Sequence, residues 1–193
     1  MDKYLEYHNL LRSRNLKGLF YRKYFLYPRL NRYTYGKKLD IGCGIGDYLQ
    51  NSNNCIGVDI NIHNIEYVNN LGFEAYLIKE DKIPFPNKHF NSIILDNVLE
   101  HIEDPKPLLD EIKRISSKDA ILIVGVPGIK GFKRDPTHQI FYDAKSLETL
   151  IKQFGFIRKK TIYLPFNLKF LSKFITQFCL YQIYERDLSE DQV

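Results

Sequence analysis

The chain has 193 residues, of which 44% are hydrophobic and 26% are charged, and its formal net charge is +5. This length corresponds to about one domain of ~100 to 200 residues, which argues against an enzyme with separate cofactor and substrate domains. The composition is ordinary for a globular protein and excludes a disordered or fibrous chain.

The sequence carries no sign of export or of a metal-binding framework. No apolar run reaches the roughly 18 residues of a membrane-spanning helix, and the charged N-terminus is unlike a signal peptide. The cysteines Cys43, Cys55 and Cys179 are odd in number and have no metal-ligand spacing. We therefore predict a cytoplasmic protein with free thiols and no metal site.

Residues 1–37 form a basic arm that is rich in tyrosine. The first 38 residues carry a net charge of +8, residues 39–157 carry −5 and residues 158–193 carry +2, and the arm holds seven of the 14 tyrosines. We predict that this arm is a helical lid over the active site. Anionic lipid or a phosphate-bearing acceptor is the second candidate for its partner, and RNA is the third because no RNA-binding module accompanies it.

From residue 38 to residue 193, short apolar runs alternate with stretches of helical periodicity. The predicted strands are Leu39–Gly42, Cys55–Ile60, Glu74–Ile78, Ser92–Asp96, Ala120–Val126, Phe156–Leu164 and Leu180–Glu185. The predicted helices cover about residues 46–53, Pro105–Ser116, Lys145–Phe154 and, as an insertion between the last two strands, about residues 167–178. Near-continuous apolar strands are typical of a parallel sheet with helices on both faces. The pattern predicts a doubly wound, mostly parallel α/β sheet in one domain.

A glycine-rich loop follows the first predicted strand. Its glycines, Gly42, Gly44 and Gly46, let the backbone approach a ligand closely, and a helix after them would offer free N–H groups. A P-loop would need a Lys-Ser/Thr pair where this chain has Asp47 and Tyr48. The dinucleotide fingerprint G-x-G-x-x-G also has a different spacing. Both of these cofactor classes are therefore disfavoured.

Two aspartates near this loop favour a different ligand. Asp40 lies before the first glycine, where its charge would repel a pyrophosphate but attract an ammonium group. Asp59 ends the second strand 19 residues later, a position from which a carboxylate can accept ribose hydroxyls. S-adenosylmethionine carries both an α-amino group and a ribose. The pair of acids therefore indicates S-adenosylmethionine, with S-adenosylhomocysteine as the product.

Further segments extend this pattern along the chain. Residues 39–49 and Asp59 contain the strand, the loop and the acid just described, residues 83–90 read IPFPNKHF, and residues 97–105 read NVLEHIEDP. Together they resemble the class I S-adenosylmethionine-dependent methyltransferases of the type-11 branch. The departures from that family are Asn91 in place of Asp and residues 116–119 in place of a Pro-Gly turn. The resemblance implies a seven-stranded, Rossmann-like methyltransferase sheet.

The resemblance also implies roles around the cofactor. Asp40 and the backbone of the glycine loop would hold the methionine end, Asp59 would hold the ribose, and Ile60 would flank the adenine. Either Glu80 or Asp81 would accept from the adenine amino group, and the spacing does not decide between them. The implied cofactor-binding residues are Asp40, Gly42, Cys43, Gly44, Gly46, Asp59, Ile60, Glu80, Asp81, Asp96 and Asn97.

The acceptor side offers fewer candidates. Asp96 and Asn97, at the end of the fourth strand, would lie beside the reacting methyl group. His138, on the loop after the fifth strand, is a candidate general base or acceptor-binding residue because histidine titrates near neutral pH, and His101 is a second, weaker candidate. Tyr142 either lines the acceptor pocket or belongs to the core.

The expected reaction is O-methylation of a sugar, a lipid-linked glycan or another small acceptor. The basic arm and the apolar face of the helix predicted at about residues 167–178 favour such an acceptor and allow peripheral contact with the inner face of a membrane. The alternatives are a quinone-like metabolite, an RNA substrate, or a non-catalytic protein that only binds S-adenosylmethionine. The glycine spacing and Asp40 disfavour a nicotinamide-dependent oxidoreductase.

Overall fold

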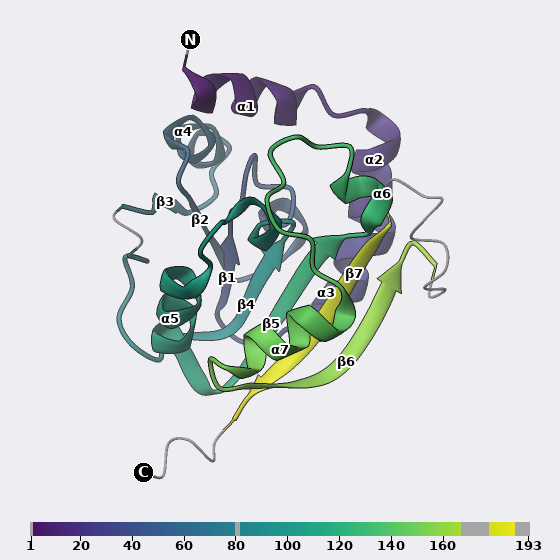
Figure 1. The fold of residues 1–193 in the computed structure, drawn as a ribbon. Helices are drawn as coiled ribbons and strands as arrows, with labels where there is room; N and C mark the ends of the chain where they lie inside the picture. Colours follow the sequence, from purple (N-terminus) through teal and green to yellow (C-terminus); the bar gives the residue numbers. More distant parts are fainter. Residues whose placement is uncertain (1, 80–81, 167–177, 188–193) are drawn as a thin grey trace.

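The computed structural model describes residues 2–79, 82–166 and 178–187, which form a seven-stranded sheet in the order β3-β2-β1-β4-β5-β7-β6 (Figure 1). The strands are β1 (Lys38–Ile41), β2 (Cys55–Asp59), β3 (Ala75–Leu77), β4 (Phe90–Asp96), β5 (Ser116–Pro127), β6 (Phe156–Leu164) and β7 (Cys179–Arg186). Strands β1 to β5 pair in parallel, whereas β7 runs antiparallel to both β5 and β6. The predicted doubly wound, mostly parallel sheet is therefore confirmed.

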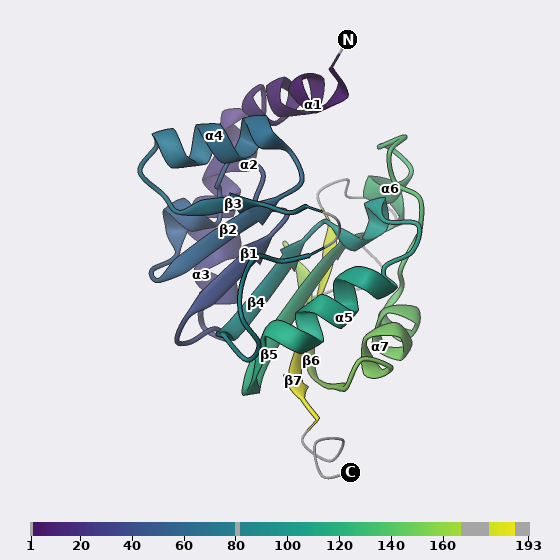
Figure 2. The ribbon, with the colours of Figure 1, turned by 90° about the vertical axis from the view of Figure 1, so that its left-hand side faces the viewer.

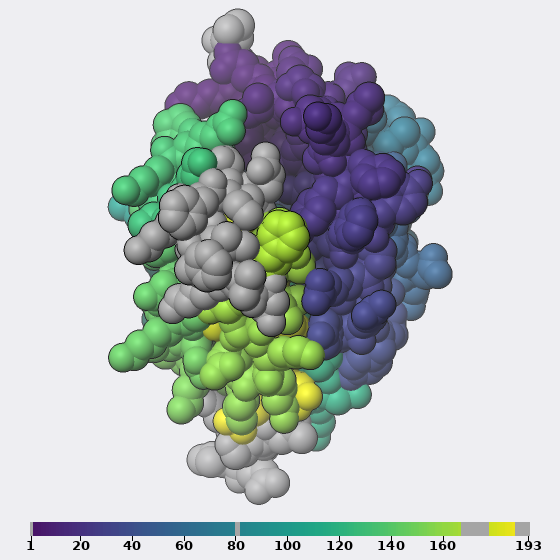
Figure 3. Space-filling view, turned by 90° about the vertical axis from the view of Figure 1, so that its right-hand side faces the viewer, coloured from purple at the N-terminus to yellow at the C-terminus, as the bar shows by residue number. Residues whose placement is uncertain are grey.

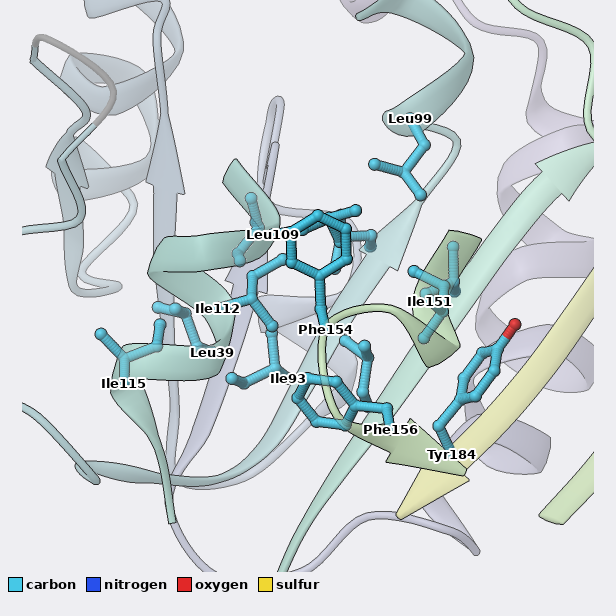
Figure 4. Packing of buried hydrophobic residues seen from close by; sticks show 14 of the residues in the cluster. Leu39, Ile93, Leu99, Leu109, Ile112, Ile115, Ile151, Phe154, Phe156 and Tyr184 are labelled. Carbon is cyan, nitrogen blue, oxygen red and sulfur yellow. The ribbon is translucent and has the colours of Figure 1, made fainter. Parts of the chain in front are cut away.

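Helices cover both faces of this sheet (Figures 1 and 2). On one face lie α5 (Lys106–Ile115) and α7 (Ala144–Lys152), and on the other lie α4 (Ile62–Asn70), η1 (Arg22–Leu26) and α3 (Tyr27–Asn31). Helix α5 buries Leu109, Ile112 and Ile115, which recur at helical spacing, against β1 and β4 in the cluster of Figure 4. The apolar strands are thus enclosed on both sides, as their composition predicts.

The N-terminal arm is helical and lies across the carboxyl ends of the central strands. Helix α1 (Lys3–Arg12) is capped by the Asp2 side chain and packs against α4, and α2 (Leu16–Tyr21) is capped by Asn15. Figure 3 shows the arm, in purple, as a continuous layer on the outside of the molecule. None of the described helices has the length and apolar character needed to cross a bilayer.

The local structure after the glycine loop differs from the prediction. Where a helix was expected at about residues 46–53, the chain forms turns and a short 3-10 segment, η2 (Leu49–Asn51). Gly46 adopts a φ of +81°, which a helix cannot contain. Helix α4, in contrast, was not predicted, because the polar residues of the segment INIHNIEYVNN obscure its apolar face. Of the helix predicted at about residues 167–178, residues 167–177 lie outside the described residues.

Candidate active site

A cavity of about 980 Å³ opens at the carboxyl ends of β1, β2 and β4, beneath the N-terminal arm. It is lined by ten of the thirteen predicted site residues, namely Asp40, Gly42, Cys43, Gly44, Asp59, Ile60, Asp96, Asn97, His101 and His138. A doubly wound sheet binds its ligands at this edge because the strand order reverses there. A separate depression of about 550 Å³, at the amino ends of β1 to β3, contains none of them.

The remaining predicted residues lie elsewhere. Gly46 is not on the cavity wall, and a Cβ there would lie 3.1 Å from Val68, so its role is to let the loop pack on α4. Glu80 and Asp81 lie outside the described residues. Tyr142 is buried in the core cluster under α7, so the core interpretation of this residue is correct.

The glycine loop is tied to β2 through its own N–H groups. The N–H groups of Gly42 and Cys43 both donate to the Val58 carbonyl, at 2.8 and 3.1 Å, and that of Gly44 donates to Asp59 Oδ2 at 2.8 Å. The expectation that these N–H groups and a following helix N-terminus bind a carboxylate is therefore wrong. A ligand carboxylate would need other donors, and the guanidinium groups of Arg14 and Arg22 line the same cavity.

Acidic side chains dominate the cofactor side of the cavity. Asp40, Asp47, Asp59 and Asp96 all line it. Asp40 lies on the central strand β1 and is only 3% exposed, and burial, followed by the charges of Asp96 and Asp59, raises its pKa well above the ordinary value. Negative side chains in a low-dielectric pocket favour a cation. The site is therefore suited to a ligand that carries positive charge.

Asp59 is held in place by three hydrogen bonds. Its Oδ2 accepts from Gly44 N and from Asn64 Nδ2, and its Oδ1 accepts from Asn61 N. Burial raises its pKa even though these bonds lower it. A carboxylate has about four lone-pair sites, so roughly one site is left for a ligand hydroxyl. The sequence predicted two ribose hydroxyls on Asp59, and the second would have to displace one of these partners.

Asp96 links the end of β4 to the N-terminal arm. Its Oδ2 accepts from Arg22 Nη1 at 2.9 Å, and its Oδ1 accepts from Tyr181 Oη at 2.6 Å and from Asn97 Nδ2 at 2.8 Å. Arg22 also donates to Tyr27 Oη at 3.0 Å. Sequence reasoning missed Arg22 and Tyr181, because they lie 74 and 85 positions from Asp96.

The two candidate histidines lie together on the acceptor side. The ring centroids of His101 and His138 are 4.6 Å apart, and His138 Nδ1 bonds to the carbonyl of Phe132 at 2.9 Å. His138 Nε2 lies 3.8 Å from Oε1 of Glu100, which is buried and was not predicted as a site residue. Burial, followed by the charge of His138, lowers the pKa of His101. Burial raises the pKa of Glu100 to about 8.

Comparisons with known proteins agree with this architecture. A family model described as a methyltransferase domain matches residues 11–157. In sequence, the chain is 31% identical over 91 residues to Uncharacterized protein MJ1123 of Methanocaldococcus jannaschii, a match that covers 47% of this chain and 44% of that protein. The chain therefore spans less than half the length of this curated relative.

Solved structures share the fold at low sequence identity. A SAM-dependent methyltransferase from Archaeoglobus fulgidus has a TM-score of 0.66 at 20% identity and covers 89% of this chain and 100% of its own. A chain from the complex between the Haloferax volcanii Trm112 methyltransferase activator and a putative methyltransferase has a TM-score of 0.75 at 13% identity, over 97% and 99% of the two chains. At these identities, the similarity establishes the fold alone.

Proposed function

The chain belongs to the family of methyltransferase domains, and we propose that it transfers the methyl group of S-adenosylmethionine to an oxygen atom of a small or glycan-like acceptor. The observation that carries this proposal is the single acid-lined cavity in which Asp40, Asp59 and Asp96 converge. S-adenosylmethionine is a sulfonium with an ammonium group, and such a cation suits these carboxylates. Binding sites for small molecules enclose about 300 to 1,000 Å³, so a cavity of about 980 Å³ has room for the cofactor and a second small molecule.

The residues of the chain would chiefly bind and align the reactants. When bound, S-adenosylmethionine supplies an activated methyl group, and its C–S bond breaks with the electron pair left on sulfur. Asp40 would pair with the ammonium group, Arg14 or Arg22 with the carboxylate, and Asp59 with one ribose hydroxyl. The barrier falls mainly because the acceptor oxygen is held in line with the methyl carbon while water is excluded.

The wall opposite the acids supports a small acceptor. Tyr4, Tyr7 and Tyr21 from the arm line the cavity together with His101 and His138 from the other side. Tyrosine offers a flat apolar ring with a polar hydroxyl, which suits the faces and hydroxyls of a sugar. A quinone-like metabolite would also fit such a wall. An RNA substrate lacks comparable support, because the positive charge is confined to the arm and the central region is acidic.

The cofactor assignment has an inexpensive test. S-adenosylhomocysteine at a hundredfold excess over its dissociation constant is expected to stabilise the protein by about 2.7 kcal/mol, because it binds only the native state. A domain of this size would then melt roughly 5 to 11 °C higher in a thermal-shift titration. NAD is expected to give no shift. Stabilisation by NAD but not by S-adenosylhomocysteine would overturn the assignment. Release of S-adenosylhomocysteine with a panel of sugars and quinols then separates an enzyme from a protein that only binds the cofactor.

The outer surface of the arm supports contact with an anionic lipid surface, where a lipid-linked acceptor would reside. Leu16 is 82% exposed, and Phe20 and Phe25 are each 59% exposed, beside the exposed Lys17 and Lys23. Exposed aromatic and aliphatic side chains next to lysine are typical of helices that lie in a membrane interface. We therefore propose that this face binds the membrane peripherally.

Vesicle sedimentation tests this contact. Wild-type protein is expected to bind vesicles that contain phosphatidylglycerol, and a Phe20→Glu/Phe25→Glu variant is expected to bind at least tenfold more weakly, because each buried phenylalanine contributes about 1.5 to 3 kcal/mol. Leu71→Glu, at a position 45% exposed beyond the end of α4, is the matched control and should bind like wild type. Equal sedimentation of all three proteins would contradict a role for the arm.

A further inference from the structure

Three potential metal ligands gather on the acceptor side of the cavity. Glu100 and His101 lie on the single turn η3 (Leu99–His101), and His138 lies on the loop after α6 (Ile129–Phe132). Each offers one ligand atom, and these atoms all lie within 4.8 Å of one another. An ion about 2.0 to 2.2 Å from each ligand would hold neighbouring ligand atoms roughly 3 to 4 Å apart. The 3.8 Å between His138 Nε2 and Glu100 Oε1 falls in that range.

The Glu100 carboxyl group is buried without a partner. Glu100 is 1% exposed, and neither of its side-chain oxygens has a hydrogen-bond partner among the described residues. A buried carboxyl group in that state is costly, and nearly all buried polar groups in proteins are paired. The separation from His138 Nε2 is too long for a hydrogen bond between them. Something that the protein chain does not supply is therefore expected to satisfy this carboxylate.

Both imidazole rings are oriented by their Nδ1 atoms. His138 Nδ1 donates to the Phe132 carbonyl at 2.9 Å, which leaves Nε2 with its lone pair. His101 Nδ1 lies 3.1 Å from Thr137 Oγ1, and that hydroxyl gives its proton to Asp135 Oδ1 at 2.6 Å, so Nδ1 of His101 is the donor. Metal-binding histidines show this arrangement, in which one ring nitrogen donates to a carbonyl or hydroxyl and the other binds the ion.

The backbone fixes the two halves of the cluster relative to each other. The Glu100 carbonyl accepts from Gln139 N at 2.7 Å and from Ile140 N at 3.2 Å, and the Gln139 side chain donates to the His101 carbonyl at 3.1 Å. These bonds join the η3 turn to the loop that carries His138. The geometry of the three ligands is therefore set before any ion arrives, which lowers the cost of binding.

We propose that Glu100, His101 and His138 bind one divalent transition-metal cation such as Zn²⁺ or Mn²⁺. Two imidazole nitrogens with one carboxylate oxygen suit zinc, manganese or iron, whereas magnesium prefers a full set of oxygen ligands. Three protein ligands leave coordination positions open, as in catalytic rather than structural sites. The lowered pKa of His101 keeps that ring neutral and able to ligate.

The cation would hold the acceptor, and this role rests on the proposed methyltransferase function. His101 and His138 line the cavity that also contains Asp96 and Asn97, so the open positions face the space where an acceptor hydroxyl would bind. A bound hydroxyl becomes more acidic and gives its proton to water. The oxygen then forms a bond to the methyl carbon as the C–S bond breaks. A ring nitrogen that binds the ion cannot also take this proton, so the cation replaces the general base predicted at His138.

Metal binding by the full chain tests the site without any acceptor. Protein stripped with a chelator is titrated with Zn²⁺ and with Mn²⁺ in competition with a chromophoric chelator. Wild type is expected to bind one equivalent, and Glu100→Gln and His138→Gln are each expected to bind at least a hundredfold more weakly. Loss of an outer partner costs about 10- to 100-fold, which is the range expected for Thr137→Val. His89→Gln, paired with Lys37 and not among the residues that line the cavity, is the matched control.

The possible outcomes separate this proposal from the proposed function. Stoichiometric binding that Glu100→Gln abolishes supports the site, whatever the enzyme assay shows. Absence of stoichiometric binding, or equal affinity in Glu100→Gln and wild type, overturns it. Calorimetry with S-adenosylhomocysteine on the stripped variants shows that they are folded and still bind the cofactor. Methyl transfer at the full wild-type rate in stripped protein would leave the proposed function intact but remove the role of the cation.

Discussion

Replacing Asp40 by asparagine is expected to abolish measurable S-adenosylhomocysteine binding while leaving a protein that is more stable than wild type. Asp40 is 3% exposed on the central strand and has Asp96 and Asp59 as its nearest charges. A ligand ammonium group that loses a buried ionic partner costs about 3 to 5 kcal/mol, or at least a hundredfold in affinity. The free protein, in contrast, no longer has to bury a carboxylate among other acids.

The pH dependence of stability gives the same variant a second signature. Because the folded protein raises the pKa of Asp40 above its ordinary value of 3.8, the folded state binds the proton more tightly than the unfolded state. The stability from this group is present below that value and is lost as the pH rises toward the folded pKa. Asp40→Asn should remove this loss, so its melting temperature should exceed that of wild type most clearly at high pH.

The affinity for the cofactor should change in the opposite direction. The ammonium group binds the ionised form of Asp40, so the affinity of wild type is expected to rise with pH, whereas the residual affinity of Asp40→Asn should not. Calorimetry at several pH values measures this difference. Asp110→Asn, at an exposed position on α5, is the control and should match wild type in both assays. Cofactor affinity in Asp40→Asn within threefold of wild type would exclude Asp40 as the ammonium partner.

The strands and the cofactor side of the site could be predicted because their signals are local. Apolar runs such as Ile93–Leu95 mark buried strands, and the order of Asp40, the glycines and Asp59 along 20 residues carries the chemistry of the ligand. What the loop does with its N–H groups could not be predicted in the same way. Gly42 and Cys43 donate to Val58, a contact between neighbouring strands that no local pattern encodes.

The acceptor side depends on contacts between distant parts of the chain. His101 and His138 were candidates from their positions, but their ring contact joins a turn after β4 to a loop after β5. Glu100 reads in sequence as an ordinary residue of a family motif, and only its burial without a partner marks it as a site residue. The cysteine count, which argued against a metal site, says nothing about a cluster of histidine and glutamate.

The relation of the arm to the site also required the structure. Its charge of +8 suggested an anionic partner, yet two of its arginines are engaged inside the protein. Arg14 pairs with Asp47 at 2.7 Å, and Arg22 pairs with Asp96 at 2.9 Å. The arm is therefore bound to the acidic body through ion pairs at the cavity wall, and only part of its charge is available to an external partner.

Replacing Arg22 by methionine is expected to lower stability and cofactor affinity together. The substitution keeps an unbranched apolar chain of similar reach but removes the guanidinium group that donates to Asp96 and to Tyr27. The Asp96 side chain, 8% exposed, would then keep only Tyr181 and Asn97 as partners. Breaking a partly buried ion pair in this way costs about 3 kcal/mol, which corresponds to roughly 6 to 12 °C in melting temperature for a domain of this size.

A double-mutant cycle separates the ion pair from general damage to the arm. Asp96→Asn alone is also expected to destabilise the protein, but adding it to Arg22→Met should cost little more, because the interaction has already been lost. Lys23→Met, at the next and exposed position, is the control and should melt within about 1 °C of wild type, since surface substitutions rarely exceed about 0.5 kcal/mol. If the two substitutions were additive, Arg22 and Asp96 would act independently, and the arm would owe its position over the cavity to apolar packing around Leu26 and Leu30.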